Sequence, residues 1–126
     1  MKTSICLFLI LSLFSCYAAP PAGWVEMTGP DPIILSWAKV NQGKKLEESP
    51  LVMIQKHENS TKWQNALKNI PALSDGCKEV SAKKNGDWNQ LYCELNKNVY
   101  VYLWKGNATD TEFALQEAKK WLKNNE

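Results

Sequence analysis

Runs of apolar residues, separated by turn-forming residues, divide the chain into short extended segments and two helices. β-Branched and aromatic residues without helical spacing predict extended structure at residues 24–25, 33–40, 51–57, 77–83, 88–95 and 99–105. Two other regions repeat apolar residues with the 3.6-residue period of a helix. Their apolar faces hold Trp63, Ala66, Leu67 and Ile70 in the first region, and Ala114, Leu115, Ala118, Trp121 and Leu122 in the second. The order β-β-β-α-β-β-β-α predicts an α+β fold, with two helices packed on an antiparallel sheet of about five to six strands.

Polar residues at the ends of the two helical regions predict where each helix begins and ends. Thr61, three residues before Gln64, has the spacing of a capping box, and Pro71 is expected to end the first helix. Thr109 or Asp110 is the predicted cap of the second helix. Late in that helix come three lysines, which suit the negative end of the helix dipole: Lys119, Lys120 and Lys123.

The first residues of the chain have the layout of a secretory signal peptide. Residues 5–14 are almost wholly apolar, follow a single lysine, and precede a stretch of small residues. A membrane span needs about 20 apolar residues, so this run is too short to cross a bilayer stably. Cleavage after Ala18 would remove residues 1–18 and leave residues 19–126 as a single domain. We therefore expect an exported protein, either periplasmic or secreted.

A second interpretation of the same segment predicts a lipoprotein. Leu13-Phe14-Ser15-Cys16 resembles a bacterial lipobox, in which the cysteine is lipidated and retained at the mature N-terminus. Phe14 is bulkier than the residue that this motif usually carries. Membrane attachment is expected only if Cys16 is lipidated; free secretion is the favoured interpretation, and the lipoprotein is the alternative.

Composition narrows the classes of partner. The chain has 126 residues, is 44% hydrophobic and carries a formal net charge of +2, which is too small to indicate a nucleic-acid-binding protein by electrostatics. All 15 of its basic residues are lysines. The missing arginine is the residue best suited to bidentate recognition of phosphate or carboxylate groups. Composition therefore gives no support for a nucleic-acid partner.

Two of the four cysteines are predicted to form a disulfide. Cys6 lies inside the expected signal peptide and Cys16 lies inside it or at its edge, so the folded part keeps Cys77 and Cys93. An exported chain with two remaining thiols most simply pairs them. A reactive or metal-bound pair is the alternative, although the chain has no CxxC motif to support thiol exchange.

The turn between these cysteines predicts how the two strands align. Asn85-Gly86 between two extended runs is a strong hairpin signal. A two-residue turn there places Lys78 opposite Cys93, and Cys77 then misses Cys93 by one position. We therefore expect one bulge near the start of the first strand, which brings the two sulfur atoms together.

The order of the elements resembles the PsbP-like superfamily of small α+β domains, which includes exported bacterial domains related to DcrB. The resemblance covers most of residues 19–126, with Pro21-Ala22-Gly23-Trp24 at the entry to the first strand and a closing helix over residues 114–123. Only Pro21 and Trp24 match the family's pattern by residue type. The expected disulfide departs from that pattern. The resemblance implies an accessory or partner-binding module rather than an enzyme.

Residues suited to catalysis or metal binding are few. His57 is the only histidine, and no HExxH motif surrounds it, so a zinc site or a nucleophile–base pair is poorly supplied. Carboxylate pairs about 5–10 Å apart could serve a glycosidase. The candidate pairs are Glu26 with Asp31, Glu47 with Glu48, and Asp87 with Glu94. These residues lie in turns or outward strand positions, so we expect that the protein is not an enzyme, with a cell-envelope glycan hydrolase as the alternative. We also expect no cofactor and no bound metal.

The six tryptophans fall into two groups. Four lie on apolar faces and are predicted to pack in the core: Trp37, Trp63, Trp104 and Trp121. Trp24 and Trp88 each border a turn, and Trp88 stands beside Asp87 and Asn89. An aromatic ring flanked by polar residues can anchor a protein partner or stack on a sugar, and the alternative is that it covers the end of its own sheet. We expect an exported, non-catalytic accessory or binding protein, with a secreted inhibitor or immunity protein as a further alternative.

Overall fold

The computed structural model describes residues 19–40, 43, 45, 48–70, 77–81, 88–95 and 97–125. Along these residues the chain forms β1 (Trp24–Glu26), β2 (Ile33–Lys39), β3 (Leu51–Glu58), α2 (Thr61–Leu67), β4 (Cys77–Ser81), β5 (Asn89–Leu95), β6 (Asn98–Lys105) and α3 (Ala108–Asn125). This order confirms the predicted α+β class. The predicted signal peptide and the candidate lipidation site Cys16 lie outside the described residues, as do Pro71 and the Asn85-Gly86 turn.

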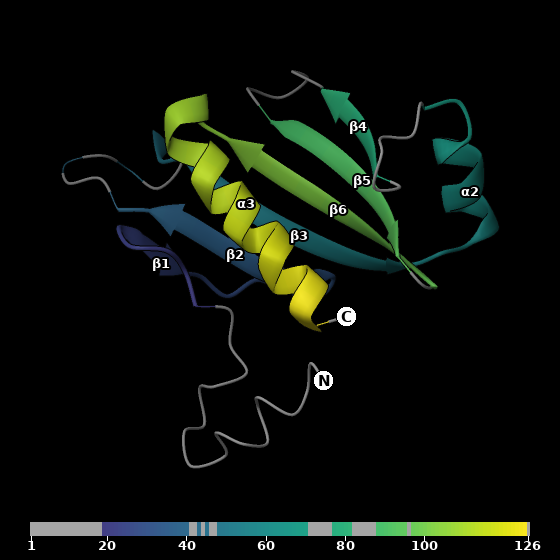
Figure 1. Cartoon of the computed structure of the whole chain (residues 1–126), viewed down its shortest axis with the longest axis horizontal. Helices are drawn as coiled ribbons and strands as arrows, with labels where there is room; N and C mark the ends of the chain where they lie inside the picture. The colour runs from purple at the N-terminus through teal and green to yellow at the C-terminus, as the bar shows by residue number, and fades with distance from the viewer. Residues whose placement is uncertain are drawn as a thin grey trace, which may run out of the picture.

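A six-stranded antiparallel sheet forms the frame of the molecule (Figure 1). Its strand order is β1-β2-β3-β6-β5-β4, so two three-stranded meanders meet at the centre. The central seam is the pairing of β3 with β6, which runs through eight residue pairs from Leu51–Lys105 to Glu58–Asn98. The predicted meander of the last three strands is therefore confirmed, with β4 as one edge of the whole sheet.

The longer helix, α3, crosses one face of this sheet and packs against β3 and β6 (Figure 1). The helix contributes Ala114, Leu115, Ala118 and Leu122 to the core. The sheet contributes alternate residues, among them Trp37, Ile54, Tyr100 and Tyr102. Trp37 is 1% exposed, and Trp104 and Trp121 pack against this cluster as half-buried side chains. These three tryptophans are core residues, as predicted.

The shorter helix, α2, packs on the opposite face. Leu67 forms a second cluster with Val99 and Val101, which alternate along β6 with the tyrosines of the first cluster. Because successive side chains of a strand point to opposite faces, the two clusters lie on opposite sides of the sheet. Trp63 packs against the second cluster, which confirms the prediction for this residue. Ala66, which was predicted to share this apolar face, is exposed.

The cap of α2 differs from the prediction by one residue. Ser60 precedes the helix, and its hydroxyl oxygen accepts a hydrogen bond from the backbone N–H of Trp63 at 3.5 Å. Thr61, the predicted cap, is instead the first helical residue. An N-cap binds the N–H two or three positions further on, and a serine one residue earlier meets this requirement as well as a threonine does.

The cap of α3 also lies earlier than predicted. The side-chain oxygen of Asn107 accepts a hydrogen bond from the N–H of Asp110 at 2.9 Å, and the helix begins at Ala108. Thr109 and Asp110, the predicted caps, lie inside the first turn. The Asp110 carboxylate contacts Lys39 Nζ on β2 at 2.5 Å, so it links the helix to the sheet.

Candidate functional site

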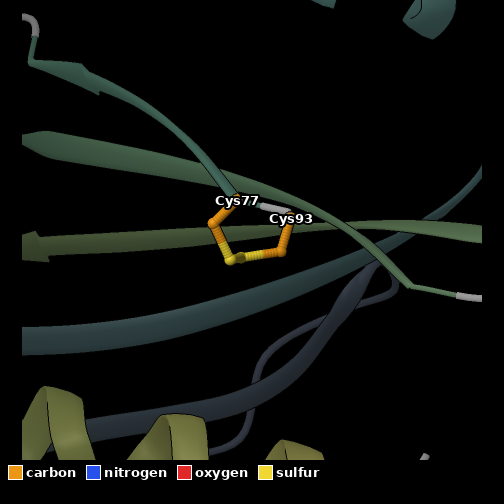
Figure 2. Close-up of a disulfide and its surroundings, with 2 residues drawn as sticks. All are labelled: Cys77 and Cys93. Atoms are coloured by element: carbon orange, nitrogen blue, oxygen red, sulfur yellow. A yellow bond between two sulfur atoms is a disulfide. The ribbon is translucent and has the colours of Figure 1, made fainter. Parts of the chain in front are cut away.

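The predicted disulfide between Cys77 and Cys93 is present and joins the edge strand β4 to β5 (Figure 2). The two Cα atoms are 4.0 Å apart, and both side chains are buried on the α3 face of the sheet. The two cysteines pair directly, and Lys78 pairs with Tyr92. The predicted offset and bulge are therefore wrong. The observed pairing is therefore shifted by one residue from the register that a two-residue Asn85-Gly86 turn would give.

A groove of about 620 Å³ runs beside this disulfide. It exists because α3 packs over β3 and β6, so β5 and β4 extend beyond the helix on the same face. The residues that line it are Cys77, Cys93, Glu94, Leu95, Tyr102, Gln116, Glu117, Lys119, Lys120, Leu122 and Lys123. Its volume is within the range of about 300–1,000 Å³ that is typical of small-molecule sites.

The polar side chains of the groove carry more positive than negative charge. Lys119 is half-buried, and Lys120 and Lys123 are exposed. Glu94 also borders the groove, but it pairs with Val99, so its carboxylate points to the α2 face, where it contacts Lys78 Nζ at 3.5 Å and accepts a hydrogen bond from Asn59 Nδ2 at 3.1 Å. On the α3 face, the three lysines therefore lie against the single lining carboxylate of Glu117.

Trp88, a candidate binding residue, lies on the other face of the sheet. Lys105 Nζ lies 5.4 Å from the centroid of the Trp88 ring, a cation–π contact. Lys105 pairs with Leu51 on β3, which pairs with Ala38 on β2, which in turn pairs with Val25 on β1. Paired residues point to the same face, so this row of side chains crosses the sheet from Val25 to the neighbourhood of Trp88.

Apolar side chains in and beside this row are partly exposed. Val25 is 46% exposed, and Leu51 and Trp88 are half-buried. In the adjacent row Met53 pairs with Leu103, and both are half-buried. Leu103 also packs against the cluster under α2, so this apolar area adjoins the part of the sheet that α2 covers. We call the area the Trp88 surface; it consists of Val25, Leu51, Met53, Trp88 and Leu103.

The other candidate binding residues do not all join Trp88. Trp24 is 8% exposed and packs in the core on the α3 face, so the structure does not bring the two rings together. Asn89 directly follows Trp88 in the chain, begins β5 and pairs with Trp104 on β6. Asp87 lies outside the described residues.

The carboxylate candidates for catalysis that the structure describes lie at exposed positions. Glu26, Glu48 and Asp31 are exposed, and Glu47 lies outside the described residues. His57 Nε2 is 3.0 Å from Gln55 Oε1, and its ring lies 4.8 Å from that of Trp63. Within the described part of the chain, no group of three or more histidine, cysteine or carboxylate side chains is placed to hold a metal ion.

The sequence pattern indicates Trp88 as a candidate but does not indicate the groove. The helix dipole already accounts for the three lysines near the end of α3, and Leu95 and Tyr102 have the pattern of ordinary strand residues. The available signal was the concentration of three lysines in the last turns of a helix that borders the disulfide. Recognising it requires knowing that α3 and β5 are neighbours on one face, which the tertiary structure decides.

Comparisons of the chain with protein-family models, with curated proteins and with solved structures find no match. Among the helices that the structure describes, none is both long enough and apolar enough to span a bilayer.

Proposed function

We propose that this protein is exported and works as a non-catalytic accessory protein that binds a protein partner. The observation that carries the proposal is the Trp88 surface. It places a tryptophan and four aliphatic or thioether side chains on one face of the sheet, partly open to solvent. Tryptophan and methionine are enriched at protein interfaces, and tryptophan is over-represented among the residues that contribute most binding energy.

The geometry of the Trp88 surface suits a protein partner. Four of its residues come from strands β1, β3 and β6 of one sheet, which hold them in adjacent rows, and Trp88 directly precedes β5. Lys105 Nζ lies over the Trp88 ring, next to these rows. A broad, partly apolar sheet face with a partly exposed aromatic residue is better shaped for another protein surface than for a small molecule.

Two further features support export, and a third supports a partner-binding role. The short apolar segment at residues 5–14 has the layout of a signal peptide. The Cys77–Cys93 disulfide is of a kind that persists in oxidising compartments and is rare in the cytosol. The resemblance to the PsbP-like superfamily implies a partner-binding role. We place the protein in the periplasm or outside the cell, with attachment to the membrane if Cys16 is lipidated.

Site-specific photo-crosslinking in intact cells tests the proposed interface. A benzophenone amino acid at Val25 lies on the Trp88 surface, and the same probe at Glu112 lies on an exposed part of α3 on the opposite face. We expect a discrete crosslinked species from position 25, its yield to fall when Trp88→Ala is added, and no such species from position 112. Equal crosslinking from both positions, or none from position 25, would contradict the proposal.

A further inference from the structure

We propose that the groove between α3 and β5 binds a single-chain anionic amphiphile, a free long-chain fatty acid. The alkyl chain lies over the disulfide and the apolar floor, and the carboxylate lies among the lysines of α3. This site is on the opposite face of the sheet from the Trp88 surface. The inference is therefore independent of the proposed protein contact.

The floor of the groove is apolar. The Cys77–Cys93 disulfide, Leu95, Tyr102 and Leu122 contribute to it. Leu122 and both cysteines are buried in the core cluster, and Leu95 packs against that cluster. These elements are fixed by the sheet, the disulfide and α3, so the groove is formed before a ligand arrives.

The charge of the rim selects the sign of the ligand. Lys119, Lys120 and Lys123 line the groove from one helix, and because the Glu94 carboxylate points to the α2 face, Glu117 is the lining carboxylate that opposes them. Lysine ammonium groups act as point charges on flexible stems, which suits a carboxylate at the end of a mobile chain. A cationic amphiphile would meet the same three lysines and be repelled.

The distribution of polar groups favours an alkyl chain over a peptide. A peptide laid along the disulfide would bring its backbone N–H and C=O groups against an apolar floor, and burying such groups without hydrogen bonds is costly. An alkyl chain has no such groups. A fatty acid therefore places its apolar part over the floor and its single charge at the lysine rim.

Calorimetric titration of the purified, disulfide-bonded protein with dodecanoate, below its micelle concentration, tests this inference. We expect binding of dodecanoate at one site, no measurable binding of hexanoate, and at least tenfold weaker binding of dodecyltrimethylammonium. The chain-length effect follows because each methylene that enters an apolar site strengthens binding by about fourfold.

Variants locate the site. The double variant Lys119→Gln with Lys123→Gln should weaken dodecanoate binding about three- to tenfold, the size expected for two partly exposed ion pairs. It should leave binding of dodecyltrimethylammonium unchanged or improved. The matched control is Lys62→Gln, an exposed lysine on α2 at the other face, which should bind dodecanoate like the unmodified protein.

Three results would overturn the inference. The absence of dodecanoate binding would leave the groove to a different occupant, such as a protein segment. The anionic and cationic chains binding equally would show that the lysines do not select the ligand. A loss of affinity in the Lys62 variant equal to that in the double variant would place the binding elsewhere. The crosslinking result at the Trp88 surface is unaffected by any of these outcomes.

Discussion

Individual charged side chains tie both helices to the sheet. Lys78 Nζ on β4 donates a hydrogen bond to the backbone carbonyl of Leu67 at 3.1 Å, at the end of α2, and also contacts Glu94. Lys39 on β2 contacts Asp110 in the first turn of α3. A cation thus lies at the C-terminal end of one helix and an anion at the N-terminal end of the other. Both placements are favoured by the helix dipole.

Tyr92 should make stability depend on pH in the alkaline range. Its side chain is half-buried, its hydroxyl donates to Gln90 Oε1 at 2.7 Å, and burial raises the pKa of Tyr92 above its ordinary value of 10.0. The folded state therefore holds the phenol proton more tightly than the unfolded state. The stability that the protonated Tyr92 side chain contributes is complete below pH 10 and is lost as the pH rises through the folded-state pKa of Tyr92.

Urea unfolding of the unmodified protein and of Tyr92→Phe between pH 8 and pH 11 measures this effect. The difference in the free energy of unfolding between the two proteins should be constant up to about pH 10 and then shrink. Mass spectrometry after each measurement checks that the disulfide is intact. A constant difference up to pH 11 would show that the Tyr92 pKa is the same in both states.

At the scale of the elements, α2 depends on the sheet for its stability. The helix spans Thr61–Leu67, and isolated helices shorter than about 12–15 residues are marginal in water. Leu67 is 1% exposed and is the residue of α2 that enters the second cluster. Trp63 adds ring contacts with His57 and Tyr92. The packing of two side chains therefore maintains the helix.

Leu67→Ala should lower the free energy of unfolding by about 2–5 kcal/mol, because it removes buried methyl groups and leaves a cavity under α2. Urea denaturation followed by circular dichroism gives the value. The control is Lys68→Ala at the neighbouring exposed position, for which we expect a change within about 0.5 kcal/mol. Equal effects from the two substitutions would mean that α2 does not pack on the sheet.

The junction between β6 and α3 requires a glycine. Gly106 has φ +121°, and a Cβ atom there would lie 2.9 Å from Pro50 Cβ and 3.1 Å from Thr111 Cγ2. Gly106→Ala should therefore destabilise the folded state by about 1–3 kcal/mol of backbone strain. The steric clash adds to this loss, and the melting temperature should fall. Gly23→Ala is the control, since Gly23 also has a positive φ but no atom within 4 Å of the added Cβ. Gly106→Ala losing no more stability than the control would contradict this account.

At the scale of the whole molecule, the disulfide holds the edge strand β4 to the sheet. It closes a loop with a sequence separation of 16, and β4 pairs with β5 alone. In the chain-entropy model, closing a loop of this length stabilises a fold by about 3 kcal/mol. The same bond also forms part of the groove floor, so it connects the stability of the sheet edge to the proposed fatty-acid site.

Reduction of the protein should lower its melting temperature and reduce amide-exchange protection in β4 before the central strands. The expected loss of stability is about 3 kcal/mol. The double variant Cys77→Ala with Cys93→Ala is the control, because reductant should not change its melting curve. An unmodified protein whose melting temperature is insensitive to reductant would show that the two cysteines are unpaired in solution.

Export predicts a defined mass for the natural protein. Intact-mass measurement on material from its native cells should show loss of residues 1–18. A chain that begins at Cys16 and carries a diacylglyceryl group would establish the lipoprotein interpretation instead. Recovery of the complete 126-residue chain from the cytosol would contradict both.

The positions of the elements and the identity of the cysteine pair could be predicted from the amino-acid sequence. Strands such as Leu51–Glu58 and helices such as Ala108–Asn125 are found close to the predicted positions, because hydrophobic period and β-branching act over neighbouring residues. Cys6 and Cys16 lie in or at the edge of the predicted signal peptide, which leaves only Cys77 and Cys93 in the folded part to form a disulfide. Trp88 was singled out by its polar neighbours, and the structure places it beside a partly exposed apolar row.

The way in which these elements pack together could not be predicted from local sequence patterns. The pairing of β3 with β6, the placement of the two helices on opposite faces, and the groove along α3 join residues far apart in the chain. The alternation of side chains within a strand shows that one side is buried but does not identify the strand beside it or the helix above it. Cys77 pairs directly with Cys93, so the register of β4 and β5 differs by one residue from the register that the turn signal predicts. Long-range packing selects among arrangements that local preferences leave nearly equal in free energy.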